Sequence, residues 1–530
     1  MNSYLYKMKN LLFVFLLFYG NVFAQTYVTK DNSQTDQTST LQNAFNTSNI
    51  NTVLISTNTI VNGTLTIPEG KVLKFDGGKI TGKGTINGGI IEANYHSRIF
   101  DTTLTVNPKA VNQFFSVKWF GATGNNADDY TPIQKSINIC IKNNIRTVYL
   151  PAGRYKISKP LIILNPGGFC TLEMLGESSF WDSNIGSELL PTFTNTFAIG
   201  IQNGKGCKVR KLKITGLFSP PNTSDRKKFF NTKFENFKDG VCRDSRYSPY
   251  AAIVIDPFTN LSTNKMPSDG GYPGLTSYYG LYKSFSTQTG STGTEIEEMS
   301  INNFVVGICS SPNGLTRNAE ITLINKIQFE NCKLCISGGQ DQEKANVISN
   351  IYCWGGTHTI FGTDLYGGPR MAGNWNIDHA NIAGGVVRFI YNDQHGYFPT
   401  YISHVFAESL GMWGTINSEL ACEISDCHID FEYPNVAGAQ TLITSWGENI
   451  VYRSCNFRYY GETTPMKVEG NCVFEHCYFS GPIVKKNAGI NNFFVVNQPF
   501  NKTLFLYAII FLALVALAIY VMKRKYSHSS

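Results

Sequence analysis

The sequence predicts an all-β solenoid, a parallel β-helix, from three observations. A six-residue motif recurs in the second half of the chain at steps of 19 to 29 residues. Within the motif, apolar and polar residues alternate as in a strand, and the alternation breaks once at a residue type that tolerates left-handed backbone. The chain has 530 residues, only 16% of them charged, which is too long and too apolar for a disordered protein or a disulfide-stapled mini-domain.

The two ends of the chain predict export and a membrane anchor. Residues 1–24 combine a basic start, a short apolar run and small residues before Gln25, as in a secretory signal peptide; an uncleaved anchor is the alternative. Residues 504–522 carry no charge and would span about 28 Å as a helix. The basic tail 523–530 follows, which places the body outside the cytoplasm, in the periplasm or on a bacterial cell surface. A removable sorting tail is the alternative for this end.

The body between these ends is close to electrically neutral. The formal net charge is +7, and most of it comes from six basic residues at the ends: Lys7, Lys9, Lys502, Lys523, Arg524 and Lys525. Affinity for nucleic acid comes mainly from neutralising phosphates. We therefore expect no nucleic-acid partner, and the sequence leaves the oligomeric state open.

Residues 25–110 predict a small β-coil ahead of the main one. The stretch 51–100 is Gly-rich and holds short strand-like runs. Residues 25–50 are rich in Thr, Asn, Ser and Gln, and we expect them to be loosely ordered.

An entry module over residues 118–157 predicts the start of the main coil. A capping box begins at Thr131, with Pro132 at the first helical position, and the helix is expected to end near residue 143. Strands are expected over 147–150 and 155–157. The preceding pair of aspartates lies where a helix dipole stabilises carboxylates, which favours a structural role over a catalytic one.

The entry module resembles the opening of the pectate-lyase-like β-helices, a superfamily shared with polygalacturonases and phage tailspikes. The matching residues are Phe120-Gly121-Ala122-x-Gly124, Asp128-Asp129, Ile133-Gln134 and Leu150-Pro151-x-Gly153-x-Tyr155. The resemblance implies a single-stranded right-handed parallel β-helix, here over residues 111–500, with polysaccharide as the ligand class. The module opens enzymes and non-enzymes alike.

The repeat motif reads apolar, polar, bend residue, apolar, polar, apolar. Its copies are 329–334, 348–353, 377–382, 402–407, 424–429, 452–457 and 474–479, with weaker copies at 209–214 and 296–301. The expected bend column is Asn331, Asn350, His379, His404, Asp426, Ser454 and His476. Regular turns are thus expected over 296–490. Residues 218–295 do not keep the repeat and predict a Tyr-rich excursion that either covers the coil or stacks on sugar rings.

The motif also gives roles to histidines and cysteines. Three of the eight histidines fall on the bend column. A turn ladder, in which bend residues stack on successive turns and have a structural role only, is favoured there over a metal or acid/base site because Asn and Asp share the column. An inward column is expected to hold Cys332, Cys427, Cys455 and Cys477 as small unpaired hydrophobes rather than disulfides. No resident cofactor or metal site is predicted.

Cleavage of a glycosidic bond needs two carboxyl groups flanking it. The polygalacturonase signatures Asn-Thr-Asp, Gly-His-Gly and Arg-Ile-Lys are absent, so the candidates come from the repeat register instead. They are Asp364, Asp393 and Glu408 as catalytic carboxylates, with Arg388 and His395 in support. A lyase would instead use a basic side chain with Ca²⁺ on the carboxylates.

Three hypotheses follow. The first is an exported, membrane-anchored polysaccharide hydrolase or lyase. The second is a non-catalytic glycan-binding or adhesive surface solenoid. The third is a tailspike-like depolymerase domain on a bacterial surface protein.

Overall fold

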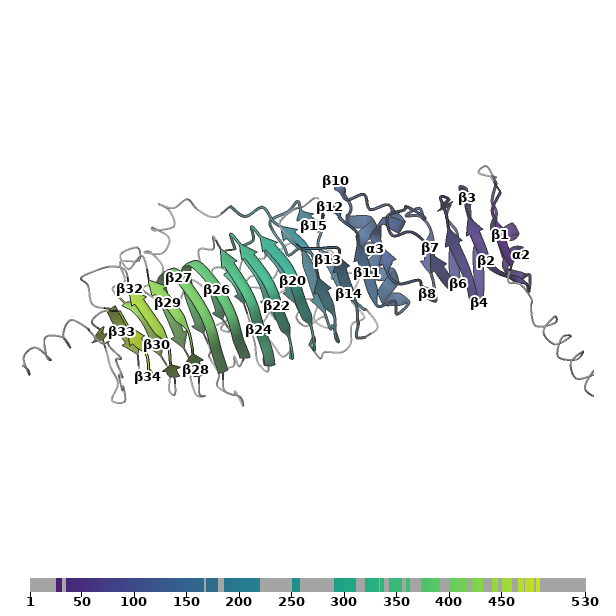
Figure 1. Cartoon of the computed structure of the whole chain (residues 1–530). Helices are drawn as coiled ribbons and strands as arrows, with labels where there is room; N and C mark the ends of the chain where they lie inside the picture. The colour runs from purple at the N-terminus through teal and green to yellow at the C-terminus, as the bar shows by residue number, and fades with distance from the viewer. Residues whose placement is uncertain are drawn as a thin grey trace, which may run out of the picture.

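The computed structural model forms one elongated stack of short parallel strands, with a smaller coil at its N-terminal end (Figure 1). It describes residues 25–30, 35–165, 168–179, 185–219, 250–257, 290–310, 320–332, 334–337, 343–354, 359–362, 373–390, 400–416, 422–431, 441–446, 450–459, 466–470, 472–480 and 483–486. The expected signal peptide, apolar span 504–522 and basic tail lie outside these ranges. Within them, no helix has the length and apolarity needed to cross a membrane.

The N-terminal coil consists of parallel strands and one helix. Its elements are β1 (Gln25–Val28), α2 (Thr38–Asn46), β2 (Ile50–Ile55), β3 (Thr59–Ile60), β4 (Thr64–Phe75), β5 (Ile80–Thr81), β6 (Thr85–Glu92), β7 (Thr105–Asn107) and β8 (Ala110–Val111). The expectation that residues 25–50 are loosely ordered is wrong for the described residues 25–30 and 35–50, which form β1 and α2. Leu41, Ala44 and Phe45 form a buried stripe at helical spacing, and this short stripe orders a segment of polar composition.

The main coil runs from β9 to β36, and all pairings between its described strands are parallel. Its elements are β9 (Phe115–Ser116), the 3₁₀ helix η1 (Val117–Phe120), β10 (Asn125–Asp128), α3 (Tyr130–Lys142), β11 (Thr147–Leu150), β12 (Gly153–Ile157), β13 (Leu161–Leu164), β14 (Glu173–Gly176), β15 (Ser187–Pro191), β16 (Ile199–Gln202), β17 (Lys208–Arg210), β18 (Lys213–Thr215), β19 (Ala251–Ile255), β20 (Glu295–Asn302), β21 (Val306–Ser310), β22 (Leu323–Glu330), β23 (Leu334–Ser337), β24 (Glu343–Trp354), β25 (Thr359–Gly362), β26 (Gly373–Ile390), β27 (Thr400–Ile416), β28 (Cys422–Ser425), β29 (His428–Phe431), β30 (Thr441–Trp446), β31 (Ile450–Arg453), β32 (Asn456–Tyr459), β33 (Met466–Gly470), β34 (Val473–Glu475), β35 (Tyr478–Phe479) and β36 (Ile483–Lys486). Each strand pairs with one a full turn later, which is the stacking of a parallel β-helix.

One bend column runs through the main coil from Lys211 to His476. Its residues, aligned by the strand register, are Lys211, Glu298, Lys326, Asn350, His379, His404, Asp426, Ser454 and His476, all with φ between 52° and 56°. Six of the seven predicted positions are confirmed. The seventh, Asn331, stacks instead on Asn303 in a second column. The true copy in that turn is 324–329, whose bend residue is a lysine and so lacks the Asn, Asp or His signature.

The inward columns are apolar, as expected. Cys427, Cys455 and Cys477 are buried, unpaired and stacked on successive turns below Val405. Cys332 is also buried and free, but it follows the second bend and is not in their column. These thiols fill space as small hydrophobes.

Helix α3 opens the main coil, and its N-terminus differs from the prediction. It begins at Tyr130, two residues before the predicted first helical position, so Pro132 is at the third position, and the side chain of the N-cap residue Asp129 makes no capping hydrogen bond. The predicted structural role of the aspartate pair is supported. Asp128 accepts hydrogen bonds from the Tyr130 N–H at 3.2 Å and the Ser158 hydroxyl at 2.7 Å, and the buried Asp129 accepts from two loop N–H groups.

Strand β19 lies inside the predicted excursion. It pairs with β16 and β21 and is buried at all five residues, so a turn of the coil passes through the middle of 218–295. The adjacent Tyr250 is 2% exposed and packs on Phe304 at 4.9 Å between ring centroids. This tyrosine therefore packs in the core, while the other tyrosines of the segment lie outside the described residues.

Candidate functional site

A row of outward side chains follows the bend column on the strands of the later turns. We call it the aromatic face; its described members include Gln328, Tyr352, Asn381, Phe406 and His428 at one register position, and Trp354 and Glu408 two residues further along their strands. Inward neighbours alternate with them and are buried, because side chains of a strand point alternately to its two faces. The rigid ladder fixes the spacing of these groups at one strand separation per turn, about 4.8 Å.

Two large aromatic side chains on this face are exposed. Trp354 is 50% and Phe406 is 41% exposed. Phe406 stacks on His428 at 5.2 Å between centroids, and the His428 ring is held by Asp430 at 3.0 Å. An aromatic ring held in a fixed position at the surface offers an apolar face to a ligand.

A hollow of about 540 Å³ adjoins the face over the earlier turns. Its lining includes Lys211, Glu298, Lys326, Gln328, Asn350 and Tyr352. Charges of both signs alternate there, with the Lys326 ammonium 4.0 Å from the Glu298 carboxylate. Such a surface offers many hydrogen-bond donors and acceptors without a strong net charge.

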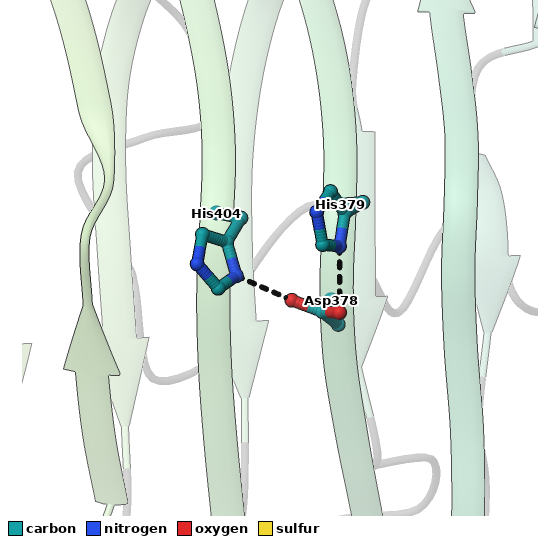
Figure 2. A group of neighbouring side chains, drawn as sticks. All are labelled: Asp378, His379 and His404. Atoms are coloured by element: carbon teal, nitrogen blue, oxygen red, sulfur yellow. Dashed lines mark hydrogen bonds and ion pairs between the residues drawn. The ribbon is translucent and has the colours of Figure 1, made fainter.

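One turn beyond the hollow lies a compact triad, Asp378, His379 and His404 (Figure 2). The Asp378 carboxylate contacts the Nδ1 atom of His379 at 2.6 Å and that of His404 at 2.7 Å. The two rings stack at 4.7 Å between centroids and 19° between planes. The Ser403 hydroxyl donates a third hydrogen bond to this carboxylate at 2.8 Å.

These contacts determine the protonation of Asp378. Partial burial opposes ionisation, but hydrogen bonds from His404, Ser403 and His379 outweigh it and lower the pKa of Asp378 below its ordinary value. The carboxylate is therefore ionised at neutral pH.

The predicted catalytic residues are only partly covered by the described residues. Asp364, Asp393 and His395 lie outside them. Arg388 is in β26, paired with β25 and β27, but its side chain is not described. Glu408 is exposed on the aromatic face, next to Ala383 of the preceding turn. The predicted carboxylate pair thus stays a prediction.

Sequence reasoning missed Asp378 and the exposed aromatics. The triad had a signal: two consecutive copies of the motif carry histidine at the bend, and the first of them has aspartate just before it. The aromatic face also had one, since Tyr352 and Phe406 occupy the same outward motif position.

The sequence matches no family model and no curated protein. Several solved structures are similar. The catalytic domain of a GH87 alpha-1,3-glucanase in complex with tetrasaccharides is 11% identical with a TM-score of 0.39, covering 69% of this chain and 67% of its own. The Azotobacter vinelandii mannuronan C-5 epimerase AlgE4 A-module is 12% identical with a TM-score of 0.38, covering 72% and 99%. Tailspike protein 2 of bacteriophage CBA120 is 14% identical with a TM-score of 0.31, covering 72% of this chain and 45% of its own.

The stacked parallel strands of this chain are themselves a parallel β-helix, the class of fold implied by the entry module. At such identities the likeness concerns the fold alone. The chemistry of the site must therefore be argued from its own residues.

Proposed function

We propose that this chain is an exported, membrane-anchored β-helix that binds polysaccharide along the aromatic face and cleaves it. The observation that carries the proposal is the pair of exposed aromatic side chains Trp354 and Phe406, which lie two turns apart on one face of the coil, next to a hollow of about 540 Å³ lined partly by charged and amide side chains. Aromatic rings present apolar faces to sugar rings, while the amide and charged groups of the hollow hydrogen-bond hydroxyl groups.

For cleavage, we propose Glu408, Asp364 and Asp393 as the carboxylates, with Arg388 and His395 in support. Glu408 is two residues from Phe406 on one strand, so both point outward from the same turn. A carboxylate pair about 5 Å apart would suit a retaining hydrolase, and a pair about 6.5–9.5 Å apart an inverting one. If the chain is a lyase, Ca²⁺ on the carboxylates would stabilise the charge that develops on the uronate.

The test is a polysaccharide panel with the full-length chain in detergent. Trp354→Ala and Phe406→Ala should each lower affinity by about 2- to 10-fold. Tyr401→Ala is the matched control, because Tyr401 is 49% exposed on the same strand as Phe406 but lies before the bend. Unchanged binding in both face variants, or an equal loss in the control, would place the ligand elsewhere.

Reducing ends and absorbance of unsaturated uronates would then separate hydrolase from lyase. Asp364→Asn and Asp393→Asn should each abolish cleavage and leave binding intact. The second candidate function, a non-catalytic glycan-binding or adhesive solenoid, is favoured by the aromatic row itself, which needs no carboxylate. It predicts binding that depends on Trp354 and Phe406 without any product.

A further inference from the structure

We propose that Asp378, His379 and His404 bind one divalent transition-metal ion at the edge of the aromatic face. One ligand atom from each side chain lies within 4.8 Å of the other two. The inference stands independently of the proposed function, because it concerns only these three side chains and their supports.

The backbone holds the two histidines in place. Both have left-handed backbone, with φ of 55° and 53°, and they occupy adjacent turns of one column. The strands on either side of this bend are paired, Asp378 with Ser403 and Ala380 with Val405. A ligand set built on a rigid ladder needs little reorganisation to accept an ion.

A turn ladder explains the backbone at these positions but not the side chains. Asn350, Asp426 and Ser454 adopt the same left-handed geometry, so the bend does not require histidine. At His379 and His404, however, both Nδ1 atoms converge on one carboxylate instead of pointing apart. The Ser403 hydroxyl donates a further hydrogen bond to that carboxylate, as outer partners do for ligands in metal sites.

The donor set selects the class of ion. Two imidazole nitrogens with one carboxylate oxygen suit Zn²⁺, Ni²⁺ or Cu²⁺, whereas Ca²⁺ and Mg²⁺ prefer oxygen ligands. Neutral imidazole can move its proton from Nδ1 to Nε2, which frees Nδ1 for the ion without ionising the ring. Ligand–metal bonds near 2.0–2.2 Å place two ligand atoms at most about 4.4 Å apart, close to the 4.8 Å within which these three atoms already lie.

The site is open to the surroundings. The side chains of Asp378, His379 and His404 are 44%, 59% and 52% exposed. Three protein ligands on one side would leave the remaining coordination positions to water or to an oxygen of a bound ligand.

The experiment is calorimetric titration of the full-length chain in detergent with Ni²⁺. The wild-type chain should bind one more Ni²⁺ than the double variant His379→Asn/His404→Asn, and Asp378→Asn should also lose that site. Asn is chosen because it already occupies the neighbouring bend at Asn350. His476→Asn is the matched control, the same substitution on the same column, and should keep wild-type binding. Ser403→Ala should weaken binding by about 10-fold.

A second measurement uses the unmodified chain. Ni²⁺ should protect His379 and His404 from modification by diethyl pyrocarbonate, read by peptide mass spectrometry, and leave His476 reactive. Equal Ni²⁺ stoichiometry in the wild type and the double variant, or equal modification with and without Ni²⁺, would overturn the site. Neither readout depends on polysaccharide, so its failure is distinct from failure of the proposed function.

Discussion

The two coils of the molecule make their bends with different residues. In the N-terminal coil, the described residues with positive φ are glycines, at 70, 77, 82, 88 and 89. In the main coil, the long bend column is built of side-chain-bearing residues. At Gly82 and Gly88 an added Cβ would lie 2.4 Å from a carbonyl oxygen of the turn below, so a side chain has no room. The bends of the main coil have space for side chains, and the polar side chains of the hollow and of the triad occupy this space.

The coils nevertheless begin in the same way. Helices α2 and α3 both carry glutamine at the fifth position, and each glutamine amide hydrogen-bonds the N–H and C=O of one strand residue. Gln42 pairs with Thr66 at 2.8 and 3.0 Å, and Gln134 with Ile162 at 2.8 and 2.9 Å. Each amide thus stands in for a neighbouring strand at the open end of its coil, where unpaired backbone groups would otherwise be exposed.

The sequences before and after helices α2 and α3 share two further features. An aspartate lies two residues before each helix, and both Asp36 and Asp128 accept a hydrogen bond from the first helical N–H. A Thr-Val pair also occurs in the strand after each helix, at the third position of β2 (Thr52) and at the first position of β11 (Thr147). The N-terminal coil therefore has an entry module of its own, with a shorter helix.

The largest expected effect tests the glycine bends. Gly82→Ala should lower the free energy of unfolding of the N-terminal coil by about 3 kcal/mol, because a φ of +110° and a close carbonyl both oppose a Cβ. The matched control is Gly70→Ala, where φ is +75° but nothing lies within 4 Å, and about 1 kcal/mol is expected. Hydrogen exchange of peptides from β4 and β6 would measure both. Equal destabilisation would mean that close packing of the turns is not what requires glycine.

The next prediction separates the two glutamines. Gln134→Ala should cost about 2 kcal/mol, because it leaves the N–H and C=O of buried Ile162 without partners. Gln42→Ala should cost about 0.5 kcal/mol, because water can replace the amide at exposed Thr66.

Urea unfolding of the full-length chain would measure this difference. Asn138→Ala removes only a contact of the Gln134 amide on the exposed side of α3 and serves as the control. A Gln42 variant as destabilised as the Gln134 variant would contradict the argument from burial.

The third prediction concerns the bend column of the main coil. His476 has a φ of 52° and is exposed, so its backbone geometry matters more than its packing. His476→Val should destabilise the chain by about 1 kcal/mol, because a β-branched residue is strained in the left-handed region. His476→Asn should stay within about 0.5 kcal/mol of the wild type. Thermal unfolding that ranks Val equal to Asn would show that the column tolerates any side chain.

The sequence predicted the main coil well because its repeat carries a double constraint. Residues such as Ile377 and Ile382 must face inward, and a residue between them must bend, so the six copies from 348 onward were found in register. The first copy was misplaced because Lys326 makes the bend there, and lysine is not a typical left-handed residue.

The site was harder to predict, for a physical reason. Exposed positions such as Trp354 and Phe406 are free of the packing constraint that makes the inward residues periodic. The convergence of Asp378 with two histidines depends on the pairing of strands 25 residues apart, which is set by the register rather than by local sequence. Helix α2 was missed because three buried residues in a polar segment give too short a stripe to recognise.

The smallest expected effects concern the acid dependence of the two entry modules. A hydrogen bond from the Thr38 hydroxyl lowers the pKa of Asp36. At Asp128 burial opposes ionisation, but hydrogen bonds from Ser158 and Tyr130 lower its pKa as well. At Asp129 burial dominates over the hydrogen bonds from Thr123 and Gly124 and raises its pKa.

The lowered and the raised pKa values make the stability of the fold depend on pH with opposite signs, in different pH ranges. Asp36 and Asp128 stabilise the fold above their unfolded pKa, and this contribution is lost as the pH falls below about 4. For Asp129 the folded protein binds its proton more readily than the unfolded chain, so stability rises as the pH falls toward about 4. Asp129→Asn should therefore remove a gain on mild acidification, whereas Asp36→Asn and Asp128→Asn should each reduce the loss below about pH 4. Urea unfolding across this range measures how the free energy of unfolding of each variant depends on pH. If Asp128→Asn and Asp129→Asn change that dependence in the same direction, the two neighbouring aspartates do not have distinct environments.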